Sequence, residues 1–182
     1  MPERWYAIQV VGGREVSTCR MIQKCLDIEQ KQTGGRSASE VFVPHYMKAV
    51  RKQGVVETTT ELLLPGYVIA VSRDAEALSL RMRRIPALTR VLGNGTEFIP
   101  LSRQEADWIN RYAEGPDRTV ELSEGLIHPG DVIEVVKGPL KGQEAKITHV
   151  AQRKCEAYLE MEFAGRTVEV KVGLSLVRAK RD

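Results

Sequence analysis

Histidine and cysteine are the residue types in this 182-residue chain best suited to catalysis or metal binding, and their spacing favours neither. The three histidines (His45, His128 and His149) lie far apart, and none sits in a pattern of Ser, Cys or carboxylates that recurs as a site. The three cysteines include no C-x-x-C pair, and the chain has no Walker A loop and no H-E-x-x-H motif. The sequence therefore predicts that the protein is not an enzyme, and we expect no cofactor and no metal.

Arginine offers a different chemistry near the middle of the chain. Arg81, Arg83 and Arg84 cluster in the last turn of a predicted helix, where cations suit the helix dipole, and Arg90 follows. Guanidinium groups pair with phosphates and stack on bases. A solvated helix end is the alternative interpretation of this cluster.

A second basic segment spans residues 45–54. Lys48, Arg51 and Lys52 lie in it, and Gly54 ends it. The Val- and Thr-rich stretch 55–60 then predicts an extended arm. The basic tip could contact nucleic acid, and a flexible hairpin without such a contact is the alternative.

An uncharged stretch, residues 62–71, has a Pro-Gly pair in its middle. Pro65 fixes φ and Gly66 tolerates positive φ, so the chain is expected to bend sharply and to enter a buried strand. Tyr67 combines an apolar ring with a hydroxyl, which suits the edge of an interface. A core strand with a tight entry turn is the plainest interpretation.

The elements before residue 112 alternate between strand and helix periodicity. Ser102 and Glu105 have the spacing of a capping box, and Asp74 is a fair N-cap. The first six elements follow a ferredoxin-like βαββαβ order, and a further helix comes after them. In chain order we predict a strand at 5–11, a helix at 14–28, strands at 40–44 and 67–71, a helix at 75–85, a strand at 88–92 and a helix at 102–112.

The pattern changes after residue 112. Residues 113–123 are polar and acidic and read as a linker. From residue 124 glycines punctuate short apolar runs. Five short strands with tight turns are predicted there, which suggests a small SH3-like β-barrel. We therefore predict an α+β chain with a first domain at 1–112, a linker at 113–123 and a barrel at 124–182.

The composition is that of an ordinary soluble protein, with 42% hydrophobic and 28% charged residues. The net charge is +3, and most of it belongs to the first 112 residues, which carry 16 Lys and Arg against 12 Asp and Glu. No apolar run reaches the roughly 18 residues of a membrane helix, and no signal peptide is recognisable. The odd cysteine count fits reduced thiols, so we expect a cytoplasmic protein.

Residues 130–142 carry a recognisable motif. They read Gly-Asp-Val-Ile-Glu-Val-Val-Lys-Gly-Pro-Leu-Lys-Gly, which resembles the KOW motif of SH3-like barrels in transcription and ribosomal proteins. Ala145 stands where that family more often has glycine. The glycines are explained by turn geometry, so by themselves they indicate the fold and not the function.

With this motif in place, the first domain resembles the NusG N-terminal domain. Trp5-Tyr6, Val43-Pro44, residues 64–68 and residues 84–86 occur in the order and spacing of that family. The resemblance covers essentially the whole chain. Within the family, the Arg-rich residues 81–86 and the run 97–102 look like a specialised paralogue of the LoaP antiterminator type.

The resemblance implies binding to RNA polymerase. NusG-type N-terminal domains have a hydrophobic depression for the clamp helices of the β′ subunit, and Leu64 stands where the family often has Phe. Bound there, such a factor suppresses pausing and termination. The family implies a monomer in the bacterial cytoplasm. The matching positions are Trp5, Tyr6, Val43, Pro44, Leu64, Pro65, Gly66 and Tyr67.

The resemblance also implies nucleic-acid and protein partners. Relatives approach upstream DNA and the non-template strand with residues matching Arg81, Arg83, Arg84 and Arg90, and the second basic tip is Lys48, Arg51 and Lys52. KOW barrels of the family bind Rho, a ribosomal protein or leader RNA. The candidate barrel residues are Lys137, Lys141, Lys146, Arg153, Lys154, Arg166 and Lys171.

Two alternatives remain open from the sequence. The chain could be the general housekeeping factor of the family instead of a specialised one. It could also be a ribosome- or RNA-binding KOW module whose first domain serves only as a scaffold.

Overall fold

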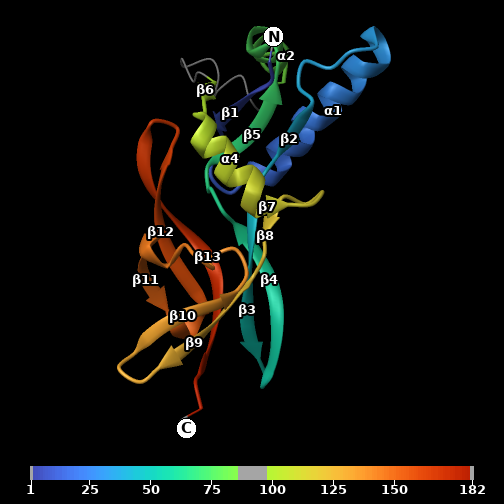
Figure 1. The fold of residues 1–182 in the computed structure, drawn as a ribbon. Helices are drawn as coiled ribbons and strands as arrows, with labels where there is room; N and C mark the ends of the chain where they lie inside the picture. The colour runs from blue at the N-terminus through green and yellow to red at the C-terminus, as the bar shows by residue number, and fades with distance from the viewer. Residues whose placement is uncertain (1, 86–97, 181–182) are drawn as a thin grey trace. The chain divides into compact units, whose positions relative to one another are not determined.

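The computed structural model describes residues 2–85 and 98–180. Contacts between residues divide the chain into two compact units. One unit holds Met1–Val43 with Leu64–Asp107, and the other holds Pro44–Leu63 with Trp108–Asp182. The chain is a mixed helix-and-strand protein (Figure 1). The strand predicted at 88–92 lies outside the described residues.

A four-stranded antiparallel sheet forms the centre of the first unit. Its strands are β1 (Arg4–Gln9), β2 (Glu40–Phe42), β5 (Tyr67–Ser72) and β6 (Ile99–Pro100), in the order β2-β5-β1-β6. All six residues of β5 are buried. A continuous apolar run suits a strand covered on both faces, so the sequence-based expectation for the end of the 62–71 stretch is confirmed.

Helix α1 (Glu15–Thr33) lies against this sheet. It runs past the predicted end at residue 28 and stops at Gly34, whose φ of 74° gives a left-handed cap. Because its buried positions recur every three or four residues, one face of the helix packs inward. Its buried apolar side chains are Cys19, Ile22 and Leu26.

Both helices predicted from capping signals are present. Helix α2 (Ala75–Met82) begins where Asp74 accepts a hydrogen bond from the Ala77 N–H at 2.9 Å. Helix α4 (Arg103–Tyr112) begins with a reciprocal capping box. The Glu105 N–H donates to Ser102 Oγ at 3.2 Å, and the Ser102 N–H donates to Glu105 Oε2 at 2.5 Å.

A long β-hairpin belongs to the second unit. Strands β3 (His45–Lys52) and β4 (Val55–Leu62) pair over eight positions without a bulge. Gln53 and Gly54 both have positive φ, 51° and 82°, as a two-residue hairpin turn with the right twist requires. The basic segment and the extended arm expected from the sequence are therefore the two strands of one hairpin.

Two short strands lie inside the predicted linker. Strand β7 (Ala113–Glu114) pairs antiparallel with β8 (Thr119–Val120), and β8 pairs in parallel with β3. The sheet order is β4-β3-β8-β7, so β4 is an edge strand.

The rest of the second unit is a five-stranded sheet, the number of strands predicted for this part of the chain. Strand β13 is long enough to pair antiparallel with β12 through its first half and in parallel with β9 through its second. Phe163, Leu159 and Leu174 are almost fully buried in its core. The strands are β9 (Ser123–His128), β10 (Val132–Lys137), β11 (Ile147–Ala151), β12 (Glu156–Phe163) and β13 (Arg166–Arg178), in the order β10-β9-β13-β12-β11.

Candidate functional site

The Pro-Gly turn between residues 64 and 67 has one defined geometry. Tyr67 N–H donates to the Leu64 carbonyl at 3.3 Å, and Gly66, in the third position, has a φ of 87°. Proline in the second position and positive φ in the third are the marks of a type II turn. The turn predicted from the sequence is therefore confirmed.

Two neighbours fix this turn in place. The Val10 N–H donates to the Gly66 carbonyl at 2.9 Å, and the Gly66 N–H donates to Glu15 Oε1 at 2.9 Å. Glu15 is 3% exposed. The end of β1 and the start of α1 therefore hold both polar groups of the Gly66 backbone, and the turn cannot move without breaking them.

The ionisation of Glu15 reflects these contacts. Burial opposes the charged carboxylate and would raise its pKa, but backbone N–H groups of Glu15, Gly66 and Gly13 favour the charge. Their combined effect lowers the pKa of Glu15 below its ordinary value. Sequence reasoning missed this residue, although an acid in the first turn of a helix after a Gly-Gly pair is a usable signal.

The eight candidate polymerase-binding residues differ in exposure. Pro65 is exposed, and Trp5, Tyr6 and Gly66 are half-buried. Within the turn, Pro65 is exposed, whereas the side chains of Leu64 and Tyr67 enter the core. The buried members of the set are Val43, Pro44, Leu64 and Tyr67.

Trp5 and Tyr6 occupy opposite faces of the sheet, because successive side chains of a strand alternate. The Trp5 ring lies edge-on to Phe42 at 5.6 Å between ring centroids, and the Tyr6 ring lies edge-on to Phe98 at 6.2 Å. Tyr6 also lines an open pocket beside the start of α2, together with Arg4 and Arg73. The two rings therefore do not share one surface.

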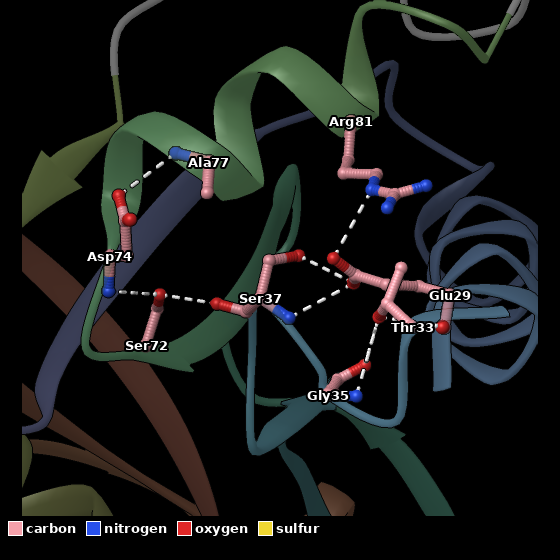
Figure 2. A network of polar contacts seen from close by, with 8 residues as sticks. All are labelled: Glu29, Thr33, Gly35, Ser37, Ser72, Asp74, Ala77 and Arg81. Carbon is pink, nitrogen blue, oxygen red and sulfur yellow. Dashed lines mark hydrogen bonds and ion pairs between the residues drawn. The ribbon is translucent and has the colours of Figure 1, made fainter. Parts of the chain in front are cut away.

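A polar network surrounds the basic end of α2 (Figure 2). Glu29, at 8% exposure, accepts hydrogen bonds at 2.9 Å from the Ser37 N–H and the Ser37 hydroxyl. Its second oxygen accepts from Arg81 Nε at 3.1 Å. Ser72 Oγ donates to the Ser37 carbonyl at 2.5 Å and accepts from the Asp74 N–H at 3.0 Å. The network joins α1, the end of β5 and both ends of α2.

This network separates the arginines that the sequence grouped together. Arg81 is engaged with the Glu29 carboxylate, whereas Arg83 and Arg84 are exposed at the end of α2. Arg90 lies outside the described residues. Two of the four candidate DNA-binding arginines therefore present their side chains to solvent in the described part of the chain.

The basic tip of the hairpin divides in the same way. Lys48 has a side chain only 15% exposed and pairs with Glu61 and Glu156. Arg51 and Lys52 are exposed, and the Lys52 amine lies 4.0 Å from a Glu57 carboxylate oxygen. Only the last two of the three predicted residues present their side chains to solvent.

The seven candidate cations of the barrel are all exposed. Arg153 and Lys154 lie in a 3₁₀ turn just before β12, whereas Arg166 follows the far end of that strand. Eight residues of strand span roughly 25 Å, so these positions do not form one patch. Lys171 lies over the Tyr158 ring at 5.6 Å from its centroid. The other candidates are Lys137, Lys141 and Lys146.

Other classes of site have no support in the described ranges. Residues 2–85 and 98–180 contain no group of three or more His, Cys, Asp or Glu side chains arranged to hold a metal ion. Within the same ranges, none of the helices has the length and apolar character needed to cross a membrane.

Comparison with known proteins places the chain among transcription factors. A family model described as "Transcription termination factor nusG" matches residues 3–110. The elongation factor Spt5 of Saccharolobus solfataricus is 25% identical, covering 97% of this chain and 94% of the relative. The termination/antitermination protein NusG of Helicobacter pylori J99 is 27% identical, covering 95% of this chain and 96% of the relative.

A solved structure described as "Domain interaction in Thermotoga maritima NusG" aligns with a TM-score of 0.49 and 15% identity, covering 95% of this chain and 94% of that one. The family model and the curated relatives define the class, a factor of transcription elongation and termination. The chain belongs to the NusG family.

Proposed function

We propose that this protein is an elongation and antitermination factor that binds RNA polymerase and suppresses pausing and termination. In this proposal residues 1–112 are a ferredoxin-like polymerase-binding domain, 113–123 a linker and 124–182 an SH3-like KOW barrel. The βαββαβ order of the first sheet and its helices supports the first assignment. The family match, which ends at residue 110, supports the boundary.

The observation that carries the proposal is the pinned turn at residues 64–67. A helix-binding surface needs rigid apolar groups, because ordering a loop on binding costs free energy. Pro65 is exposed on a turn whose backbone is fixed by Val10 and Glu15. We assign Pro65 and the half-buried ring of Trp5 to direct contact with the β′ clamp helices. The Tyr6 ring lies on the opposite face of the sheet, so this proposal leaves it out of the contact.

The buried members of the set have a supporting role in this proposal. Leu64 and Tyr67, at 3% and 7% exposure, anchor the two ends of the turn in the core, and Val43 is buried as well, at 7% exposure. Binding of such a factor would favour one pre-existing polymerase conformation, which is a population shift and not a chemical step.

A pull-down of purified RNA polymerase by the full chain tests the assignment. Trp5→Ala and Pro65→Ala are expected to weaken capture on the order of tenfold or more, as loss of an interface anchor does. Ile28→Ala, which removes an apolar side chain 53% exposed on α1, is the matched control and should leave capture unchanged. Capture that is equal for all three variants and the original chain would refute the site.

Nucleic-acid contact is the second part of the proposal. We propose that Arg83 and Arg84 contact upstream DNA or the non-template strand, with Arg51 and Lys52 as a second contact. Their exposure supports this role. Arg81 is proposed to position the end of α2 through Glu29, and Lys48 to hold the hairpin, in place of direct contact.

The barrel is proposed to recruit a second partner: leader RNA, Rho or a ribosomal protein. Lys141 and Lys146 flank one turn, and Arg153 with Lys154 forms another, so RNA would meet separate basic points. Titrating labelled leader RNA at several salt concentrations tests the RNA option. A steep decline of affinity with salt is expected, and a flat dependence or absent binding would exclude it.

We further propose that the chain is a specialised paralogue of the LoaP type, on the basis of the residues noted at 81–86 and 97–102. Genome-wide occupancy separates this proposal from a housekeeping role. Occupancy confined to a few transcripts is expected, whereas occupancy of most transcribed genes would identify the general factor.

A further inference from the structure

A buried polar cluster joins the β3–β4 hairpin to the five-stranded sheet inside the second unit. Tyr46 and Lys48 come from β3, Glu61 comes from β4, and Glu156 is the first residue of β12. Tyr46 is 1% exposed and Glu156 is 2% exposed. A carboxylate this deeply buried requires partners, because an unpaired charge in the interior costs several kcal/mol.

The hairpin supplies those partners. Tyr46 Oη lies 2.9 Å from Glu156 Oε1 and 2.8 Å from Glu61 Oε2. Lys48 Nζ lies 3.1 Å from the same Glu156 oxygen and also pairs with Glu61. The Lys48 ammonium pairs with both carboxylates, and the Tyr46 hydroxyl donates its one proton to one of them at a time.

A glycine lets the hairpin approach closely enough for these contacts. Gly173 of β13 is the direct cross-strand partner of Glu156. A Cβ built on Gly173 would collide with the carbonyl oxygen of Met47, the residue between Tyr46 and Lys48. The β3 backbone therefore lies directly on β13 at this point, and the two flanking side chains reach Glu156.

We propose that Glu156 and Gly173 form an acceptor site for the hairpin, and that the four-residue cluster is a latch that opens as a unit. The occupant is residues 45–52 of the chain itself. This inference is independent of the polymerase-binding proposal, because it concerns only contacts within the second unit.

Two properties distinguish the cluster from ordinary core packing: water reaches one edge of it, and it provides the polar contacts that hold the hairpin to the five-stranded sheet. Glu61 has a side chain 46% exposed, so water reaches one edge of the network. Seven of the eight residues of β4 are exposed, so the hairpin is retained mainly through β3. Loss of any one partner leaves Glu156 with an incomplete set, and partly satisfied buried networks are unfavourable. The basic residues Arg51 and Lys52 would be held on the barrel only while the latch is closed.

Hydrogen exchange measured by mass spectrometry on the full chain tests the latch. The variants are Tyr46→Phe, Lys48→Met and Glu156→Gln, and the matched control is Lys52→Met. Lys52 is on the same hairpin, has a side chain 72% exposed and is only loosely paired with Glu57. Each latch variant should accelerate exchange in residues 45–62 on the order of tenfold or more, with residues 166–172 still protected. The control should match the original chain.

A charge exchange provides the decisive second arm. The double variant Lys48→Glu with Glu156→Lys keeps the inventory of charges and should recover most of the hairpin protection that either single change removes. Unchanged hairpin exchange in the latch variants would overturn the proposal. Equal loss of protection in hairpin and barrel by the β3 variants would also overturn it, since the cluster would then support the whole unit. Failure of the exchanged pair to restore protection counts against the latch as well.

Discussion

At the scale of single residues, three of the four buried glutamates in the described ranges are central to the structure, and each has its own set of donors. Glu15 accepts backbone N–H groups, Glu29 accepts from Ser37 and Arg81, and Glu156 accepts from the hairpin. Side chains in such positions cost free energy unless they are paired. Neutralising any one of the three should therefore lower the stability of the fold.

Replacing Glu15 with Gln should destabilise the protein by about 1–3 kcal/mol at neutral pH, because the Gly66 N–H loses a charged acceptor. The folded-state pKa of Glu15 is lowered, so its contribution is fully present above the ordinary carboxyl pKa of 4.5 and is lost as pH falls through the lowered value. Urea unfolding at neutral and acidic pH measures both effects.

The control for this experiment is Glu76→Gln, an exposed acid in the first turn of α2. Glu76→Gln should change stability little at either pH. The difference between the Glu15 variant and the original chain should shrink in acid. A difference that stays constant from neutral to strongly acidic pH would contradict the role assigned to the carboxylate.

Substituting Gly66 with Ala should cost about 1–2 kcal/mol, because an L-residue resists the φ of 87° even though no atom lies near the added methyl group. Gly12→Ala is a matched control, since its surroundings are equally open and its φ is not in that region. Thermal unfolding measures both variants. Equal stability of the two would show that the turn is not conformationally demanding.

At the scale of elements, helix α2 is held in place by side-chain contacts at both of its ends. Its start is capped by Asp74, and Arg81 ties its last turn to Glu29 (Figure 2). These contacts leave the exposed pair Arg83 and Arg84 at a fixed helix end.

Substitutions of the α2 arginines should therefore have different effects on stability and on DNA binding. Arg81→Gln should lower stability by about 1.5–3 kcal/mol, since a hydrogen bond to a buried charge is lost. Arg83→Gln with Arg84→Gln should leave stability unchanged and weaken DNA binding. Each lost phosphate contact should reduce the salt slope, the slope of log affinity against log salt concentration, by about 0.9 on duplex DNA.

Arg20→Gln, on an exposed position of α1, is the control for both measurements. It should alter neither stability nor the salt slope. If Arg81→Gln left stability intact and reduced the slope as much as the Arg83 and Arg84 changes, Arg81 would be a contact residue and not a positioning one.

Elements with local signals could be predicted from the sequence, and those that depend on distant partners could not. The Asp74 cap, the Ser102–Glu105 box and the Pro65-Gly66 turn are encoded within four residues, and all three are present. The pairing of β8 with β3 joins residues more than 70 positions apart, and no local sequence signal predicts it.

The same distinction applies to the candidate site. Exposed arginines and lysines could be named from their types, but the engagement of Arg81 and Lys48 depends on Glu29 and Glu156, far away in the chain. The burial of Leu64 and Tyr67 agrees with the core strand and tight entry turn predicted from their apolar types. Residue types therefore identify the candidate binding residues, and tertiary contacts show which of them are exposed and which are engaged within the protein.

At the scale of the whole molecule, the family match and the division by contacts assign the β3–β4 hairpin differently. The family model covers residues 3–110 and so includes the hairpin, whereas contacts assign residues 44–63 to the second unit. A truncation after residue 112 removes Glu156 and Gly173, the acceptor of that hairpin.

We expect such a truncated chain to lose hydrogen-exchange protection in residues 45–62, because Tyr46 and Lys48 lose Glu156. Protection within α1 should remain, since its buried contacts lie in the first unit. Comparison of the full and truncated chains by mass spectrometry measures both regions. Retained hairpin protection after truncation would show that the hairpin is stable without the barrel.

The central claim is that the chain acts on transcribing RNA polymerase through the turn at residues 64–67. The most direct measurement is transcription in vitro with purified polymerase across a terminator, comparing the original chain, Pro65→Ala and the control Ile28→Ala. The account predicts that the original chain and Ile28→Ala increase read-through and that Pro65→Ala loses most of the increase. Read-through that is unaffected by the original chain, or equal for all three, would contradict it.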